Sequence, residues 1–168
     1  MRREDHDGWV TAEIRHRPLP HDAALDDAAR RIIAQLQTDG RRSYAAIAKS
    51  VGLSEAAVRQ RIQRLVETGV IRIVAVTDPR ALGLHRQAMV GVRADGDLRT
   101  VADELVRVEE VDDVVITAGG FDLLVAVSAT DDDHLLRVLD DGIRRVQGVR
   151  ETETFVYLRQ TKHTYPWG

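Results

Sequence analysis

The sequence predicts an α+β protein in which a helix-turn-helix domain precedes a sheet-containing domain of βαββαβ order. Residues 43–69 read as two short helices joined by a glycine turn, and from residue 85 onward apolar strand patterns alternate with two helical ones. The charge divides in the same way. Residues 1–84 hold 14 basic and 11 acidic side chains, whereas residues 85–168 hold 10 and 16.

We expect four segments along the chain. Residues 1–23 mix charges, histidines and two prolines without a sustained period, which is typical of a flexible N-terminal arm. A helix-turn-helix domain is expected at residues 24–76, a linker at 77–84 and the sheet-containing domain at 85–168. No apolar run is long enough to span a membrane, so we expect no membrane partner and a cytoplasmic protein.

The composition excludes several classes of site. The chain has no cysteine, and therefore no disulfide framework, thiolate metal site or thiol nucleophile. With 43% hydrophobic and 30% charged residues it is ordinary for a globular protein. A weakly acidic chain with a basic segment favours targeted nucleic-acid contact by one domain over general binding to polyanions.

Three helices are predicted in the first half. The first covers residues 25–37, where apolar side chains recur at helical spacing and Gly40 marks the end. In the second and third, Ser43 and Ser54 are N-caps, and Gly52 and Gly69 follow the last turns. Each helix has one apolar stripe to bury, and that of the third helix consists of Val58, Ile62, Leu65 and Val66.

The exposed face of the third helix is suited to reading DNA. An α-helix turns by about 100° per residue, which places Ala56, Gln60 and Gln63 opposite the apolar stripe. Arg59 and Arg64 lie on the two flanks of this exposed face. Glutamine can pair with adenine in the major groove, alanine leaves room for a thymine methyl, and arginines suit phosphates. The candidate DNA-contacting residues are Arg41, Arg42, Ser54, Ala56, Arg59, Gln60, Gln63 and Arg64.

A solvated helix face is the alternative to a DNA-binding surface, because surface helices are commonly charged. The local charge favours DNA, since residues 41–64 hold six basic side chains and one acidic one, Glu55. Arg61 lies beside the apolar stripe, so its side chain either packs its stem there or pairs internally.

The second half alternates between strand and helix patterns. Residues 70–76 are rich in β-branched side chains and read as a strand that leads into the linker. The remaining elements form two split βαβ units, which predict an antiparallel ferredoxin-like sheet with both helices on one face. Strands are expected at residues 87–94, 113–118, 122–129 and 150–160, and helices at 97–109 and 132–146.

The other face of this sheet is expected to need a cover. Several strands carry apolar side chains on both faces, for example Met89 beside Val90 and Phe155 beside Val156. A small sheet that is apolar on both sides implies association through the side without helices. We therefore expect a homodimer at least.

Together these features resemble the Lrp/AsnC (feast/famine) family of transcriptional regulators over roughly residues 25–163. The resemblance is carried by Val58, Asp78 and the segments 25–26, 39–41, 47–48, 51–54, 61–62, 64–65, 69–71, 82–83, 119–122 and 148–149. It implies a winged-helix-like DNA-binding domain, a linking strand, and a sensor domain that pairs subunits and assembles dimers into larger rings. It also implies that an amino acid or related effector binds between dimers, near Gly119, Gly120, Phe121, Asp122, Thr152 and Thr154.

The same residues support two interpretations without the resemblance. Gly119 and Gly120 suit a tight hairpin, because glycine can adopt positive φ at both positions. Their unhindered N–H groups could also hold a carboxylate while Asp122 meets an ammonium group. Thr152 and Thr154 are β-branched, which favours a strand whatever they contact.

Two other functions are compatible with a chain of this organisation. Siroheme decarboxylases share the two-domain plan, but the second half is acidic and its three histidines are widely spaced, so we expect no catalytic residues, cofactor or metal site. A nucleoid-type architectural protein would wrap DNA with little sequence preference. The protein is expected to be a sequence-specific regulator whose partners are double-stranded DNA and a small effector.

Overall fold

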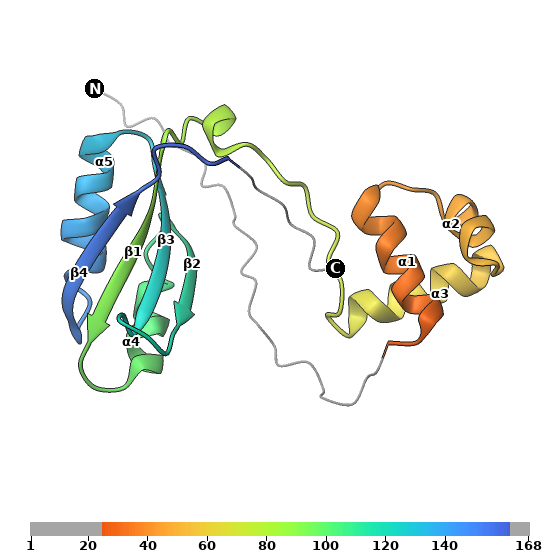
Figure 1. Ribbon diagram of the computed structural model, residues 1–168, viewed down its shortest axis with the longest axis horizontal. Helices are drawn as coiled ribbons and strands as arrows, with labels where there is room; N and C mark the ends of the chain where they lie inside the picture. The colour runs from red at the N-terminus through yellow and green to blue at the C-terminus, as the bar shows by residue number, and fades with distance from the viewer. Residues whose placement is uncertain (1–24, 162–168) are drawn as a thin grey trace, which may run out of the picture. The chain divides into compact units, whose positions relative to one another are not determined.

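The computed structural model describes residues 25–161, so the expected N-terminal arm at residues 1–23 lies outside the described part. The described chain forms two compact units that divide between Val74 and Ala75. The first unit is helical and the second contains one sheet with helices (Figure 1). Each unit is described on its own below.

The first unit is a bundle of three helices: α1 (Asp27–Thr38), α2 (Tyr44–Val51) and α3 (Glu55–Glu67). Asp26, Ser43 and Ser54 cap them, each accepting a hydrogen bond from the backbone N–H three residues on. Gly52 ends α2 in the left-handed conformation, with φ of 74°. The caps and the glycine turn predicted from the sequence are therefore confirmed.

The apolar stripes of the three helices meet in one small core. Its buried members come from all three helices: Ile32, Ile47, Ala48, Val51, Val58 and Ile62. Two expectations were wrong in detail. Val66 is 46% exposed, so the buried stripe of α3 stops at Leu65, and α1 ends at a C-cap on Asp39 before Gly40 is reached.

The predicted strand at residues 70–76 is absent from the described chain, where this segment has no regular structure. A strand needs a hydrogen-bonded neighbour, and none is present in the described part of this chain. The segment nevertheless exposes three large apolar side chains, since Ile73, Val74 and Val76 are each more than half exposed. The prediction of a strand at residues 70–76 is therefore wrong for the single chain.

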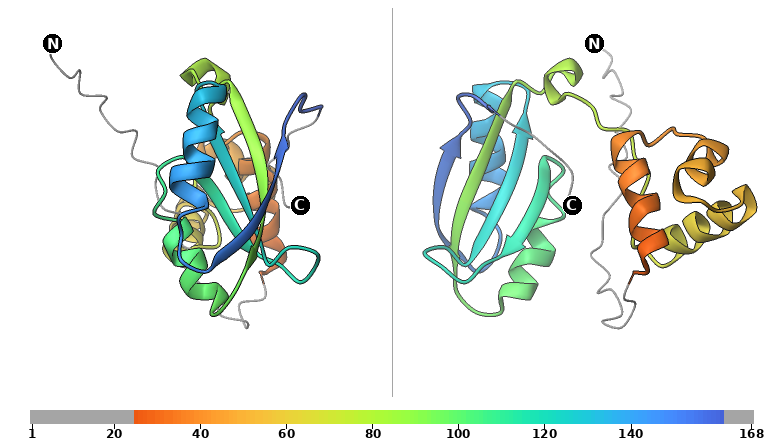
Figure 2. Two further views of the ribbon diagram at one scale, coloured as in Figure 1. Left: turned by 90° about the vertical axis from the view of Figure 1, so that its left-hand side faces the viewer. Right: turned by 45° about the vertical axis from the view of Figure 1, so that its right-hand side comes forward.

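The second unit has the ferredoxin-like arrangement. Its strands follow the order β2-β3-β1-β4, and every neighbouring pair is antiparallel. A short 3₁₀ helix precedes the sheet, and two helices connect its strands on one face (Figures 1 and 2). The elements are η1 (Pro79–Leu82), β1 (Arg86–Ala94), α4 (Leu98–Leu105), β2 (Val111–Ile116), β3 (Leu123–Ala129), α5 (Asp132–Arg137), η2 (Val138–Ile143) and β4 (Val149–Val156).

The helix predicted at residues 132–146 is α-helical only in its first half. After α5 the chain continues as η2, a π-helical segment with wider turns. Gly142 in this segment lies close to the end of α4, where a Cβ atom would come within 3.0 Å of Val108 Cγ1. The periodicity of the sequence indicated a helix but not this change in its pitch.

The connection between β2 and β3 is not the tight hairpin that the glycine pair predicted. Six residues separate Ile116 from Leu123, and neither Gly119 nor Gly120 has positive φ. Thr117 closes the loop instead: its N–H donates to the carbonyl of Asp122 at 2.9 Å, and its hydroxyl to that of Phe121 at 2.5 Å. We call residues 117–122 the β2–β3 loop.

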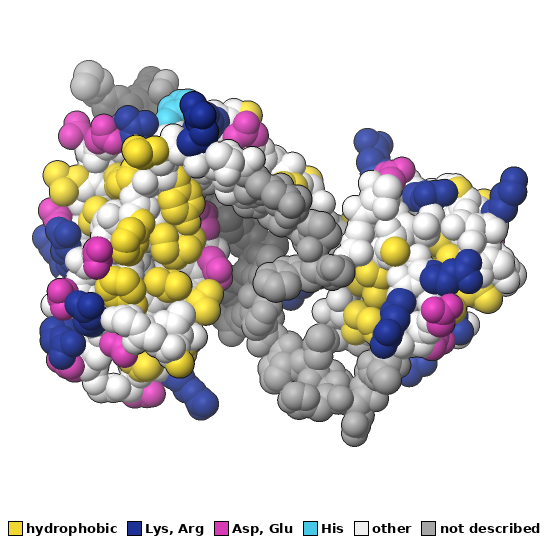
Figure 3. All heavy atoms as spheres, viewed as in Figure 1, with side chains coloured by type: hydrophobic (Ala, Val, Ile, Leu, Met, Phe, Trp, Pro, Cys, Tyr) yellow, Lys and Arg dark blue, Asp and Glu magenta, His cyan; other side chains and the backbone are white. Residues whose placement is uncertain are grey.

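Strand register assigns the side chains to the two faces of the sheet. Residues opposite one another in antiparallel strands share a face. Val90, Val92 and Leu123 belong to the core beneath the helices. The other face, which we call the open face, includes Met89 opposite Phe155, and Val115 opposite Leu124. Figure 3 shows hydrophobic side chains gathered over the sheet.

Candidate nucleic-acid interface and effector loop

Helix α3 presents a polar face to solvent. Ala56, Gln60 and Gln63 are exposed on it, opposite the buried side chains of Val58 and Ile62. The two glutamine side chains differ in their hydrogen bonding. Gln63 Nε2 donates to Glu67 Oε1 at 2.9 Å, whereas the Gln60 side chain forms no hydrogen bond within the described residues. The Gln60 amide is therefore the one ready to pair with a base edge.

The arginines of the unit fall into two groups. Arg61 pairs internally, with its Nη1 2.6 Å from Asp26 Oδ2. Two hydrogen bonds lower the pKa of the Asp26 carboxyl below its usual value. The larger effect comes from the Ala29 N–H and the smaller from Arg61. Arg64 is exposed, and no acidic side chain in the described chain pairs with it. Arg61 thus braces α3 against α1, and Arg64 remains available to a phosphate.

The remaining candidates lie around the start of α2 and α3. Arg41 is exposed and Arg42 is half-buried, and both precede the Ser43 cap. The Ser54 hydroxyl accepts from the Ala57 N–H at 3.2 Å, so it stabilises the helix end. Arg59 is exposed, and two neighbouring side chains contact it: Glu55 at 3.2 Å and the ring of Tyr44 at 5.1 Å. The structure gathers these candidates on one helical unit.

The β2–β3 loop is fastened to the open face by Phe121. The Phe121 ring lies over Gly91 so closely that a Cβ atom there would come within 2.7 Å of it. It also meets Phe155 edge-on, with ring centroids 6.1 Å apart. Glycine is therefore required at position 91 by the aromatic ring above it.

Arg93 and Asp122 hold the loop from the side. Arg93 Nε donates to the carbonyl of Gly120 at 3.0 Å, and its guanidinium lies 5.1 Å from the centre of the Phe121 ring. A hydrogen bond from Arg93 to Glu151, at 2.7 Å, raises the pKa of the arginine. Asp122 Oδ2 accepts the Ala94 N–H at 2.9 Å, where the register of β1 and β4 shifts. The second half of the loop is thus fixed to β1.

The two glycines at the loop tip are open to solvent. A Cβ atom on Gly119 or Gly120 would meet nothing within 4 Å. The second oxygen of the half-buried Asp122 carboxylate forms no hydrogen bond in the described chain. Backbone that no side chain covers and a carboxylate with one unbonded oxygen therefore lie within residues 119–122.

The structure does not bring Thr152 and Thr154 to this loop within one chain. They lie opposite Val92 and Val90, whose side chains point into the core under the helices, whereas Phe121 lies on the open face. The Thr152 hydroxyl accepts from Arg144 Nε at 3.1 Å. The residues that do surround the loop are Gly91, Arg93, Glu151 and Phe155. Sequence reasoning missed their role, because only the register of β1 and β4 places them there.

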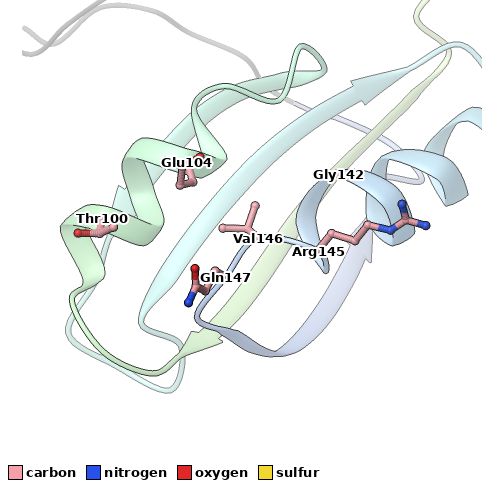
Figure 4. A pocket seen from close by; sticks show the side chains of 6 residues that line it. All are labelled: Thr100, Glu104, Gly142, Arg145, Val146 and Gln147. Carbon is pink, nitrogen blue, oxygen red and sulfur yellow. The ribbon is translucent and has the colours of Figure 1, made fainter.

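A hollow of the second unit lies elsewhere, between α4 and the chain at the end of η2 and after it (Figure 4). Its lining includes two charged side chains that already have partners. Glu104 pairs with Arg107 at 2.6 Å, and Arg145 pairs with Asp141 at 2.5 Å. The charges of this hollow are therefore balanced by neighbours rather than directed at a ligand.

Family models match both units of the chain. The AsnC-type helix-turn-helix domain matches residues 25–66, and the Lrp/AsnC ligand binding domain matches residues 87–167. The HTH-type transcriptional regulator FL11 of Pyrococcus abyssi is 36% identical over 143 residues, which cover 84% of this chain and 94% of FL11. The chain belongs to the Lrp/AsnC family of transcriptional regulators.

Solved structures agree with this fold. AsnC of Escherichia coli superposes with a TM-score of 0.77 and 23% identity, covering 84% of this chain and 97% of AsnC. A transcriptional regulator of Neisseria meningitidis in complex with L-Met gives a TM-score of 0.75 and 24% identity, covering 83% and 94%.

The family assignment decides the class of function. The chain is a DNA-binding transcriptional regulator with a helix-turn-helix domain, and not an enzyme, since its relatives are named as regulators. None of the helices in the described chain has the length and apolar character needed to cross a membrane.

Proposed function

We propose that this regulator binds specific DNA sequences through α3 and changes its assembly or DNA affinity when an amino acid binds at the β2–β3 loop. The observation that carries the DNA half is the exposed face of α3, where a free glutamine amide stands beside an unpaired arginine. The match of residues 87–167 to a ligand-binding domain supports the effector half. Since it acts on DNA, we assign the protein to the cytoplasm.

For the effector, we propose a zwitterionic amino acid. Its carboxylate would accept from the N–H groups of Gly119 and Gly120, which no side chain shields, and its ammonium group would meet Asp122. The L-Met complex of the Neisseria structural neighbour is in keeping with this class of ligand. A thermal-shift screen of the free amino acids tests the proposal, because a ligand that binds the folded state raises its melting temperature.

We also propose that the protein is at least a homodimer, in which two copies of α3 reach successive major grooves about 34 Å apart. The support is the apolar surface left uncovered in one chain. On the open face Val115 and Phe155 are each 45% exposed, and Ile73 and Val74 are exposed in the segment 70–76. Sedimentation analysis should give twice the chain mass or more, and a monomer at micromolar concentration would refute this assembly.

Two substitutions on α3 should separate base reading from phosphate binding. Gln60→Ala is expected to change the preferred base at one position of the binding site, at a cost of about 1–3 kcal/mol in discrimination. Arg64→Ala is expected to weaken all sequences alike and to lower the salt slope by about 1. Binding-site selection followed by titration at several salt concentrations measures both.

An unchanged selection profile in the Gln60→Ala variant would contradict the base-reading role.

Footprinting separates a regulator from an architectural protein. Protection confined to a few palindromic sites supports regulation, whereas continuous protection along the duplex supports wrapping.

A further inference from the structure

Arg59 is an exposed arginine whose direction is nevertheless fixed by two side chains. Its guanidinium carbon lies 5.1 Å from the centre of the Tyr44 ring, and its Nη2 lies 3.2 Å from Glu55 Oε1. The side chain is 62% exposed, so packing against the core does not hold it. One contact comes from α2 and the other from the preceding turn of α3.

Tyr44 itself is well placed to act as a platform. It is the first residue of α2, directly after the Ser43 cap, and its half-buried side chain packs against the helical core. The core therefore holds the Tyr44 ring in place, and Arg59 lies over the face of that ring. A hollow between the two helices is lined by Arg42, Ser43, Tyr44, Ala45, Glu55 and Arg59.

Glu55 needs an explanation on this surface. It is the one acidic side chain in residues 41–64, and a free carboxylate there would repel DNA phosphates. Paired with Arg59 its charge is balanced, and in the first turn of α3 it also interacts favourably with the helix dipole. The pair engages one of the five N–H donors of the guanidinium, which leaves donors for a phosphate.

The helical wheel gives the direction in which these donors lie. Arg59 is about 60° from Ala56 on the side of α3 that meets Tyr44, and Arg64 is about 80° away on the other flank. In helix-turn-helix proteins the first helix of the motif crosses the DNA backbone. Arg59 is therefore on the flank beside the helix that approaches phosphates, away from the central base-reading face.

We infer that Tyr44 and Glu55 are positioning residues that hold Arg59 toward a backbone phosphate before DNA arrives. An arginine loses rotamer freedom when it is fixed in a complex, and that loss weakens binding. Here the stack and the ion pair fix the side chain in the free protein, so less freedom is lost on the duplex. This inference rests on the proposed DNA-facing role of α3.

A double-mutant cycle on the full-length protein tests the role of Tyr44. The probe is a mixed-sequence duplex of about 30 base pairs, long enough for two successive grooves, because a phosphate contact needs no particular sequence. Arg59→Ala is expected to weaken binding about fivefold and to lower the salt slope by about 1. Tyr44→Leu is expected to weaken it about threefold, and Tyr44→Phe, which keeps the ring, to leave it unchanged.

The cycle distinguishes positioning from packing. In the Arg59→Ala background Tyr44→Leu should cost nothing further, whereas in the matched Arg64→Ala background it should keep its full threefold effect. Equal costs in both backgrounds would overturn the inference, since Tyr44 would then act through the fold. A Tyr44→Phe variant as weak as Tyr44→Leu would also overturn it, by assigning the effect to the hydroxyl. If the wild-type protein itself failed to bind, the proposed DNA-binding surface would fail instead.

Discussion

Replacing Gly91 with alanine is expected to destabilise the second unit by about 1–3 kcal/mol and to weaken the effector response at the same time. The added Cβ atom would lie 2.7 Å from the Phe121 ring, which is closer than carbon atoms approach. Because the ring is half-buried on the open face, it can move outward, and the β2–β3 loop must then move with it. Thermal unfolding and calorimetry with the amino acid found in the screen measure the two effects.

Gly119→Ala is the matched control for this prediction. A Cβ atom at position 119 meets nothing within 4 Å and the backbone there does not have positive φ, so stability should change by no more than about 0.5 kcal/mol. Combining Gly91→Ala with Phe121→Leu should cost less than the sum of the single changes. If the stability costs of the two changes were additive, the steric contact with the Phe121 ring would not be the cause of the destabilisation.

Asp122→Asn is expected to weaken amino-acid binding at least tenfold while leaving the fold and the affinity for DNA without effector unchanged. The asparagine oxygen can still accept the Ala94 N–H, as Asp122 Oδ2 does at 2.9 Å, but it carries no charge for an ammonium group. Asp122→Ala removes both interactions, so it should also lower stability by about 1 kcal/mol. The pair of variants separates the charge from the hydrogen bond.

Calorimetry on both variants decides this prediction. Unchanged amino-acid affinity in Asp122→Asn would show that the ammonium group binds elsewhere. Loss of DNA binding without effector in the same variant would show that Asp122 supports the fold or assembly, and not the ligand.

The helical unit was largely predictable because its signals are local. Ser43, Gly52 and Ser54 act within one turn of their own position, and the apolar stripes follow from helical periodicity alone. The order of strands was also predictable, since the two split βαβ units favour one antiparallel arrangement. What differed among the predicted helices and sheet strands was their ends and the π-helical turns after α5.

The candidate effector site was less predictable because it depends on register. Thr152 and Phe121 were expected at one site between dimers, and in one chain they lie on opposite faces of the sheet. A residue's face in a strand is decided by its pairing, which no local pattern gives. The contact of Arg93 with Glu151 joins residues far apart in the sequence, which no local pattern reveals. The strand predicted at residues 70–76 is absent because the described part of the chain offers no neighbouring strand to pair with it.

The tip of the β2–β3 loop has a consequence for how such a sensor can diverge. Since neither Gly119 nor Gly120 needs a glycine conformation and both have empty space around them, new side chains can be accommodated there without disturbing the sheet. Gly91 and Phe121 beneath them are constrained by a steric contact and tolerate far less change. At the effector site that we propose, single substitutions at positions 119 and 120 can thus change which ligand binds while the sheet stays unchanged.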